Sequence, residues 1–162
     1  MPAESVVRMS HFMRDHQLTV SFVESASTGR FVYDFTSVPD CGPTVRGSIV
    51  CYDPKVKESL LGVSGEVIEQ YTAESAEVTQ HLANSLKTLI PADIIIAVTG
   101  LASPGGSETP EKPVGTMFVH GYIGDEPFRK RFVFDGGPDE IIKQTIDSTA
   151  TFLLERLQSK YA

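Results

Sequence analysis

Three hydroxyl side chains lie close together in one short polar stretch of the chain. They are Ser25, Ser27 and Thr28. The stretch follows an alternating apolar run over residues 18–23 and leads, after Gly29, into an apolar pattern of helical spacing over residues 31–35. This order of strand, tight turn and helix places the hydroxyls at the carboxyl end of a strand, where open α/β sheets bind ligands and a helix start offers unpaired N–H groups. An N-cap explains one hydroxyl, so three of them favour a turn that binds a ligand or supplies a nucleophile.

A serine nucleophile needs a base, and Lys57 is the candidate. Asp53 followed by Pro54 is a strong helix-start signal, with Asp at the N-cap and Pro at the first helical position. Tyr52 is then the residue before the cap and Lys57 the fourth helical residue, two positions that meet across a helix start. A lysine acts as a base only if its pKa falls well below about 10.4, through burial or through a positive potential such as that of a first helical turn. The alternative interpretation is a rim tyrosine beside a solvated lysine.

The sequence gives little support for a metal site, a catalytic triad or a phosphate-binding glycine motif. The four histidines are scattered, without the four-residue spacing of a metal-binding helix; they are His11, His16, His81 and His120. A Ser-His-Asp triad stays open, but no histidine lies in a polar loop where a general base is expected. The pair Gly105-Gly106 precedes a strand rather than a helix, so it is not a phosphate-loop or dinucleotide signature. We expect neither a metal nor a cofactor.

Charge and composition narrow the class of protein. The chain has 162 residues and a formal net charge of −7, which argues against nucleic acid as the main partner. Its one compact basic group, Arg129–Arg131, lies in an alternating segment and is interpreted as the solvated face of a strand. No apolar run approaches the ~20 residues of a membrane span. Without a recognisable signal peptide, we expect a cytoplasmic protein with Cys41 and Cys51 as free thiols.

The pattern of the chain predicts one α/β domain over residues 1–162, with a single mixed β-sheet sandwiched between helices in three layers. Helices are predicted over residues 4–16, 31–35, 54–61 and 74–90 and from Pro138 onward, and strands over residues 18–24, 47–52, 94–98, 117–123 and 128–134. The continuous apolar run over 94–98 indicates a central strand buried on both faces. The long polar segment over 101–116 is typical of a functional or a disordered loop.

Four groups of residues resemble the CinA C-terminal domain family, whose bacterial members include nicotinamide mononucleotide deamidases. Glu24–Gly29 is similar to the family's Glu-Ser-Cys-Thr-Gly-Gly, and Tyr52 and Lys57 before Leu60-Leu61-Gly62-Val63 match its Tyr-x4-Lys and Leu-Gly-Val motifs. Residues 97–106 resemble a third motif. Residues 109–116, Thr-Pro-Glu-Lys-Pro-Val-Gly-Thr, are the most specific of the four. The resemblance spans nearly the whole chain, from Glu24 to the last helix.

This resemblance implies hydrolysis of the carboxamide of nicotinamide mononucleotide to nicotinic acid mononucleotide and ammonia, without a metal or cofactor. Ser25 would be the nucleophile and Lys57 the base, with Tyr52 assisting proton movement. The nucleotide pocket would include Glu24, Ser27, Thr28, Gly29, Thr99, Gly100, Gly105, Gly106, Thr109, Lys112, Gly115 and Thr116. The expected partner is a small pyridine nucleotide, with neither nucleic acid nor membrane, and the family implies a homodimer or higher homo-oligomer.

The chain also departs from the family pattern. The family's Gly-Ser-Ser is Asp40-Cys41-Gly42 here, and Thr28 stands in place of the first Gly of a pair. The family's Gly-Asp-Arg before the last helix is Gly136-Gly137-Pro138, so an arginine suited to a substrate phosphate or carboxylate is absent, with Arg30 and Arg46 as candidates to replace it. Two alternatives stay open: a nucleotide-binding or scaffold protein that has lost turnover, and a Ser–Lys amidase acting on a different amide.

Overall fold

Five strands form one mixed sheet in the computed structural model, which describes residues 1–162. The strands are β1 (Val20–Glu24), β2 (Val45–Val50), β3 (Ile94–Gly100), β4 (Thr116–Ile123) and β5 (Glu126–Val133). Their order across the sheet is β2-β1-β3-β4-β5. β1 runs parallel to β2 and to β3, whereas β4 pairs antiparallel with both β3 and β5. The apolar run predicted as a buried central strand is β3, which is confirmed.

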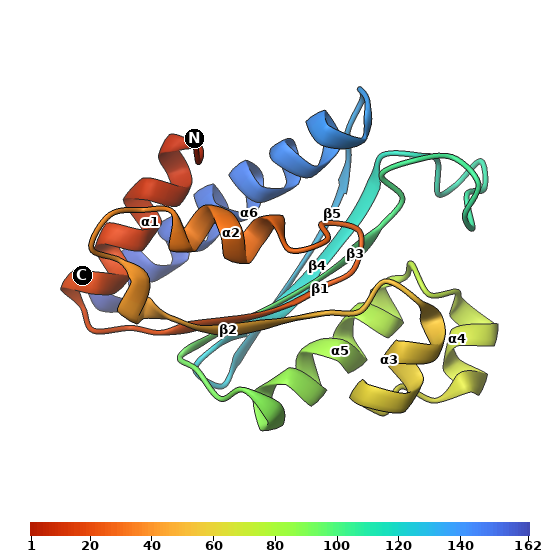
Figure 1. Cartoon of the computed structure of the whole chain (residues 1–162), viewed down its shortest axis with the longest axis horizontal. Coiled ribbons are helices and arrows are strands. Elements are labelled where there is room, and N and C mark those ends of the chain that lie inside the picture. Colours follow the sequence, from red (N-terminus) through yellow and green to blue (C-terminus); the bar gives the residue numbers. More distant parts are fainter.

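Helices cover both faces of this sheet (Figure 1). They are α1 (Glu4–Asp15), α2 (Arg30–Thr36), α3 (Pro54–Leu61), α4 (Gly65–Tyr71), α5 (Ala76–Leu89) and α6 (Pro138–Tyr161), with a short 3-10 turn, η1 (Gly42–Thr44). α1, α2 and α6 lie on one face and α3, α4 and α5 on the other, so the predicted three-layer α/β/α architecture is confirmed. None of the helices carries an apolar stretch long enough to cross a membrane.

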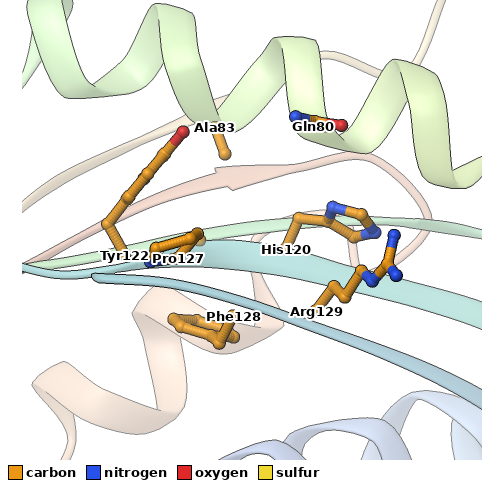
Figure 2. A pocket seen from close by; sticks show the side chains of 8 residues that line it. Gln80, Ala83, His120, Tyr122, Pro127, Phe128 and Arg129 are labelled. Atoms are coloured by element: carbon orange, nitrogen blue, oxygen red, sulfur yellow. The ribbon is translucent and has the colours of Figure 1, made fainter. Parts of the chain in front are cut away.

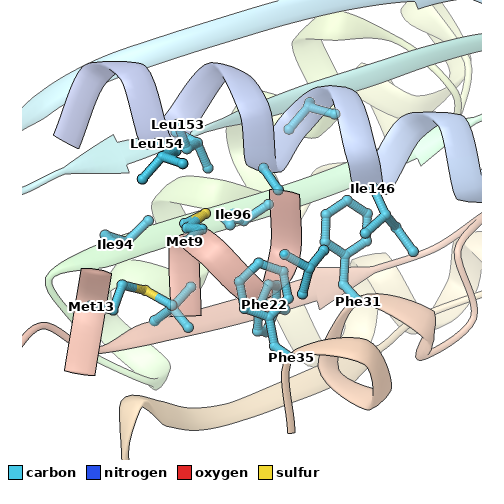
Figure 3. Close-up of a cluster of buried hydrophobic side chains, with 14 of the residues drawn as sticks. Met9, Met13, Phe22, Phe31, Phe35, Ile94, Ile96, Ile146, Leu153 and Leu154 are labelled. Atoms are coloured by element: carbon cyan, nitrogen blue, oxygen red, sulfur yellow. The ribbon is translucent and has the colours of Figure 1, made fainter. Parts of the chain in front are cut away.

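The larger hydrophobic core lies between the sheet and the helices α1, α2 and α6 (Figure 3). Met9 and Met13 of α1 meet Phe22 of β1 and the two aromatic side chains of α2, Phe31 and Phe35. The rings of Phe22 and Phe35 lie 5.2 Å apart, in the tilted arrangement that aromatic pairs prefer. A smaller core under α3 and α5 fills the opposite face. Burial of these side chains on both faces fixes the register of β1 and β3.

One helix, α4, is absent from the sequence prediction. Ser64 caps it, because its hydroxyl accepts a hydrogen bond from the Glu66 amide at 3.2 Å. None of the seven residues of α4 is fully buried, so the apolar periodicity that reveals the other helices is weak there. β2 also begins and ends two residues before its predicted bounds, at an edge of the sheet where no residue is fully buried.

The topology brings three strand ends to one place. β1 lies between β2 and β3, all three run in the same direction, and their carboxyl ends therefore meet at one edge of the sheet. The chain leaves β1 through α2 on one face and leaves β2 through α3, α4 and α5 on the other. Such a reversal opens a crevice outside the strand ends, which is where α/β sheets bind ligands.

Candidate functional site

The turn after β1 has a conformation that few side chains adopt. Thr28 has a φ of 48° and Gly29 a φ of 95°, two consecutive residues in the left-handed region. The turn is closed by the Thr28 amide, which donates to the Ser25 carbonyl at 3.1 Å. The amides of Ala26, Ser27 and Gly29 donate to no protein acceptor. Unpaired amides at a turn before a helix are available to stabilise a negative charge.

Glu24 holds this turn from inside the protein. Its side chain is fully buried, and its carboxylate accepts hydrogen bonds from the Ser27 and Ser48 hydroxyls, each at 2.9 Å. It also accepts from the amides of Phe31 at 2.8 Å and Val32 at 3.1 Å, in the first turn of α2. These four donors satisfy the carboxylate, which also balances the positive end of α2. Glu24 and Ser27 therefore shape the site from behind, and neither side chain lines the pocket described below.

Ser25 and Lys57 meet across the end of the sheet. Lys57 is only 1% exposed, and its Nζ donates to the Ser25 Oγ at 3.0 Å. The same Nζ donates to the Cys51 carbonyl at 2.9 Å and to the Tyr52 carbonyl at 3.4 Å. This is the separation that a Ser–Lys pair requires. The two residues are 32 positions apart, and they meet because β1 and β2 are parallel neighbours whose ends lie together.

The local environment favours the neutral form of Lys57. Burial lowers the pKa of its amine, and this effect is larger than the opposing attraction of Cys51, Glu74 and Asp53. The helix start is as predicted, since Asp53 is the N-cap of α3 and accepts a hydrogen bond from the Lys55 amide at 2.8 Å. Lys57 is thus held rigidly, in an environment where loss of its proton is easier than in water.

Tyr52 and Lys57 do not lie with their side chains together, contrary to the sequence prediction. Lys57 turns inward, whereas Tyr52 is 70% exposed and only its backbone carbonyl meets the amine. Lys57 turns inward because its amine forms hydrogen bonds with the Cys51 and Tyr52 carbonyls and with the Ser25 hydroxyl. The Tyr52 ring instead lines the pocket outside Ser25.

A pocket of about 440 Å³ opens in front of Ser25. It is lined by Ser25, Ala26, Thr28, Tyr52, Pro54, Glu74, the segment 100–106, Pro138 and Ile142. Of the residues predicted to bind a nucleotide, Thr28, Gly100, Gly105 and Gly106 line it. Packing requires a glycine at position 100, because a Cβ there would lie 2.3 Å from the Met117 Sδ.

The remaining predicted residues lie behind or beside the pocket. The Thr99 hydroxyl pairs with that of Thr79 at 2.8 Å, and the Thr116 hydroxyl donates to the Pro113 carbonyl at 2.7 Å, both buried. Gly115 packs so closely that a Cβ would lie 1.9 Å from the Phe134 carbonyl oxygen. Gly29 and Thr109 likewise do not line the pocket. The specific motif over 109–116 therefore shapes the loop more than the pocket wall.

Lys112 belongs to a polar cluster that ties this loop to the start of α5. Its Nζ donates to the Thr72 hydroxyl at 2.6 Å, to the Glu74 carbonyl at 2.7 Å and to the Ser107 hydroxyl at 3.0 Å. The Ser107 hydroxyl in turn donates to the Glu74 carboxylate at 2.6 Å. We call Thr72, Glu74, Ser107 and Lys112 the loop clasp. It places Glu74 in the pocket wall.

Glu74 is a candidate site residue that the sequence analysis did not identify. It is the one charged side chain among those that line the pocket. It forms no ion pair within 4 Å with a lysine, arginine or histidine. No local signal marks it, because it stands just before a helix as many surface glutamates do. Only the folded chain brings it beside Ser25.

No arginine takes the place of the one missing at Pro138. Arg30 donates to the Asp139 carboxylate at 2.8 Å and does not line the pocket. Arg46 is exposed on the edge strand β2 and does not line it either. Pro138 itself lines the pocket beside Ile142, so this part of the wall is apolar.

Comparison with known proteins points to one family. The family model of the CinA C-terminal domain matches residues 3–157. CinA-like proteins of Thermosipho melanesiensis and Petrotoga mobilis are 36% and 35% identical over 143 and 144 residues, which cover 87% and 88% of this chain. The chain spans about a third of the length of these curated relatives, 35% in each case.

Solved structures show the same fold. A competence-damaged protein (CinA) superfamily protein from Klebsiella pneumoniae 700603 superposes with a TM-score of 0.89 at 23% identity, covering 96% of this chain and 97% of that one. The competence/damage-inducible protein CihA from Agrobacterium tumefaciens superposes with a TM-score of 0.86 at 25% identity and 98% coverage of both chains.

Proposed function

Because this chain belongs to the CinA C-terminal domain family, we propose that it is an amidohydrolase of the nicotinamide mononucleotide deamidase type, with Ser25 as nucleophile and Lys57 as base. The observation that carries the proposal is the 3.0 Å contact between the Lys57 Nζ and the Ser25 Oγ, at the end of the sheet and behind a pocket. A nucleophile within hydrogen-bond reach of a base that is itself held by other groups is the signature of covalent catalysis.

The contacts of Lys57 suit a neutral amine. A neutral amine has two N–H donors and one lone pair, and it has two carbonyl acceptors and one hydroxyl as neighbours here. In this neutral form the two N–H groups would donate to the Cys51 and Tyr52 carbonyls, and the Ser25 O–H would donate to the lone pair, which reverses the bond that a charged Lys57 makes to the Ser25 Oγ. The lowered pKa of Lys57, caused chiefly by burial, increases the fraction in this form at neutral pH.

The proposed reaction has two stages. Lys57 removes the proton of Ser25 as its Oγ attacks the amide carbon, and the negative charge that develops on the amide oxygen is stabilised by the free amide of Ala26, a residue that lines the pocket. The C–N bond then breaks, and ammonia leaves with the proton from Lys57. A water molecule, activated by the same amine, attacks the ester on Ser25 and releases the carboxylic acid.

The charge of the pocket supports a cationic substrate. Glu74 is its single charged lining side chain, and the ring of a nicotinamide nucleotide carries a positive charge at its glycosidic nitrogen. A carboxylate in a partly enclosed pocket attracts such a cationic ring. It gives no such attraction to a neutral carboxamide of the same shape as the ring, so the pocket should bind the cation more tightly.

The same lining favours a second candidate, a Ser–Lys amidase acting on a cationic amide that has no phosphate. No arginine, lysine or histidine lines the pocket, so no cationic side chain there can pair with a phosphate. In this alternative, nicotinamide riboside would be a better substrate than the mononucleotide. A binding or scaffold role without turnover would keep the pocket without making use of the Ser25–Lys57 contact.

Ammonia release by the purified chain from nicotinamide mononucleotide and from nicotinamide riboside tests these proposals. We expect turnover that is lost in Ser25→Ala and in Lys57→Met, where Met retains the length of the apolar part of the lysine. Faster turnover of the riboside would select the second candidate. Absence of turnover on both compounds, together with a melting temperature raised by the nucleotide, would overturn the enzymatic proposal in favour of a binding role.

A further inference from the structure

A second cavity lies between α5 and the hairpin of β4 and β5 (Figure 2). Its volume is about 270 Å³, and it shares no lining residue with the Ser25 pocket. His120 of β4 stands opposite Arg129 of β5, and Tyr122 stands opposite Pro127. These four side chains point toward α5, whereas Phe128 points to the opposite face of the sheet.

Three of the polar side chains that line this cavity have no partners within the protein. His120 is only 7% exposed, yet its ring makes no hydrogen bond. Arg129 forms neither an ion pair nor a hydrogen bond, and Gln80 of α5 makes no side-chain hydrogen bond. By contrast, Tyr122 is satisfied, because its hydroxyl donates to the Asn84 side chain. Buried polar side chains are nearly always paired in folded proteins, and His120 is the one mostly buried side chain here without a protein partner. Gln80 and Arg129 are exposed, so their donors are open to a ligand that enters the cavity beside His120.

The charge of the cavity is positive. Burial and the adjacent Arg129 guanidinium lower the pKa of His120 to about 4, against a weaker opposing effect of Glu77. The imidazole is therefore neutral at pH 7 and offers one N–H donor, beside the amide donors of Gln80 and the guanidinium of Arg129. The other walls are apolar, made by Ala83, Pro127 and the Tyr122 ring.

We propose that this cavity binds a small organic acid, with its carboxylate on Arg129, His120 and Gln80 and its apolar body against Ala83, Pro127 and Tyr122. A guanidinium matches the two oxygens of a carboxylate, and such charge-assisted hydrogen bonds are the strong ones. The volume admits a molecule of about ten non-hydrogen atoms, for which a Kd on the order of 1 mM is expected. The proposal is independent of the reaction at Ser25.

Nuclear magnetic resonance of the His120 ring, with benzoate and its uncharged isostere benzamide as probes, tests this proposal. We expect benzoate to shift the His120 signals in a saturable way and benzamide to leave them unchanged. Bound benzoate should also raise the pKa of His120, because it neutralises the Arg129 charge that holds this pKa down; Glu77 contributes equally with and without the ligand.

Matched variants on one strand identify the carboxylate partner. Arg129→Gln should weaken benzoate binding by about tenfold or more, since it removes a charge-assisted contact. Arg131→Gln is the control, because Arg131 lies on the same strand, donates to the Glu111 carbonyl and does not line this cavity. Equal binding of benzoate and benzamide, unchanged binding in Arg129→Gln, or the burial of Arg129 in a dimer of this chain that excludes benzoate would each overturn the proposal.

Discussion

Two serine–lysine pairs have the same separation in this protein but different surroundings. The Nζ of Lys57 lies 3.0 Å from the Ser25 Oγ, and the Nζ of Lys112 lies 3.0 Å from the Ser107 Oγ. Lys57 is buried, and its other acceptors are two neutral carbonyls. Lys112 is half-buried, and its serine donates its own proton to the Glu74 carboxylate at 2.6 Å.

The difference shows that distance alone does not make a nucleophile. The Ser25 Oγ has the Lys57 amine as its only hydrogen-bond partner, so its proton can pass to Lys57 when the amine is neutral and the oxygen attacks. The Ser107 proton is already held by a carboxylate. Burial lowers the pKa of Lys112 against the opposing attraction of Glu74 and Glu77, as it lowers the pKa of Lys57, so the acceptor of the serine proton is what distinguishes the two pairs. We therefore assign chemistry to Ser25 and Lys57, and a structural role to Ser107 and Lys112.

The largest expected effect separates the two pairs by activity. Lys57→Met should lower kcat by a factor of about 10²–10⁴, the usual contribution of a general base. Lys112→Met should lower it by less than about tenfold, since it removes no reacting group. The measurement is ammonia release from the better substrate, with circular dichroism to show that both variants fold. Losses of similar size would break the distinction between the pairs.

The second expected effect is on the pH dependence of the Lys57 pair. The folded-state pKa of Lys57 lies below its unfolded value of about 10.4, so kcat/KM should rise with pH as the amine loses its proton. In the same interval the unfolded chain binds more protons than the folded one, and the free energy of unfolding should therefore also rise with pH. Denaturant titrations of the wild type and of Lys57→Met across this range measure the effect. A parallel slope in both proteins would show that Lys57 is not its source.

The third effect concerns the stability that the loop clasp provides. Lys112→Met removes the amine that donates to the Thr72 hydroxyl, the Glu74 carbonyl and the Ser107 hydroxyl in a half-buried place, and leaves only the longer hydrogen bonds among these groups. We expect the free energy of unfolding to fall by about 1–3 kcal/mol, as measured by denaturant titration at neutral pH. Lys87→Met is a control, because Lys87 pairs with the exposed Asp125 and an exposed ion pair contributes little. Equal free energies of unfolding for the two variants would show that the loop clasp does not stabilise the fold.

The smallest effect is expected in the turn that carries Ser25. Thr28 adopts a φ of 48°, which costs a non-glycine residue free energy that glycine avoids. Thr28→Gly should therefore raise the free energy of unfolding by about 0.5 kcal/mol, a value that remains after the entropy cost of glycine is subtracted. Thermal unfolding detects the change. A lower melting temperature would mean that the Thr28 side chain contributes contacts that outweigh the strain.

Local sequence determined much of the fold and part of the site. Asp53-Pro54 places the start of α3 and with it Lys57 on the fourth helical residue, because capping involves only neighbours along the chain. The apolar run of β3 and the spacing in α5 are equally local. The short helix α4 left no such signal because none of its residues is fully buried. Capping does not determine the direction of a side chain. The predicted contact between the Tyr52 and Lys57 side chains was wrong because the lysine turns inward to the Cys51 and Tyr52 carbonyls and to Ser25, which is 32 residues away in the sequence.

Only the tertiary structure decided which residues meet. Ser25 and Lys57 come together because β1 and β2 lie side by side, and Glu74 enters the pocket because the loop clasp holds it there. His120 and Arg129 meet because β4 and β5 pair in one register. A sequence determines the elements through interactions between near neighbours, whereas a site depends on the packing of elements that are distant along the chain. That packing also decides which side chains are buried, and through burial it sets the charge state on which the proposed chemistry of Lys57 depends.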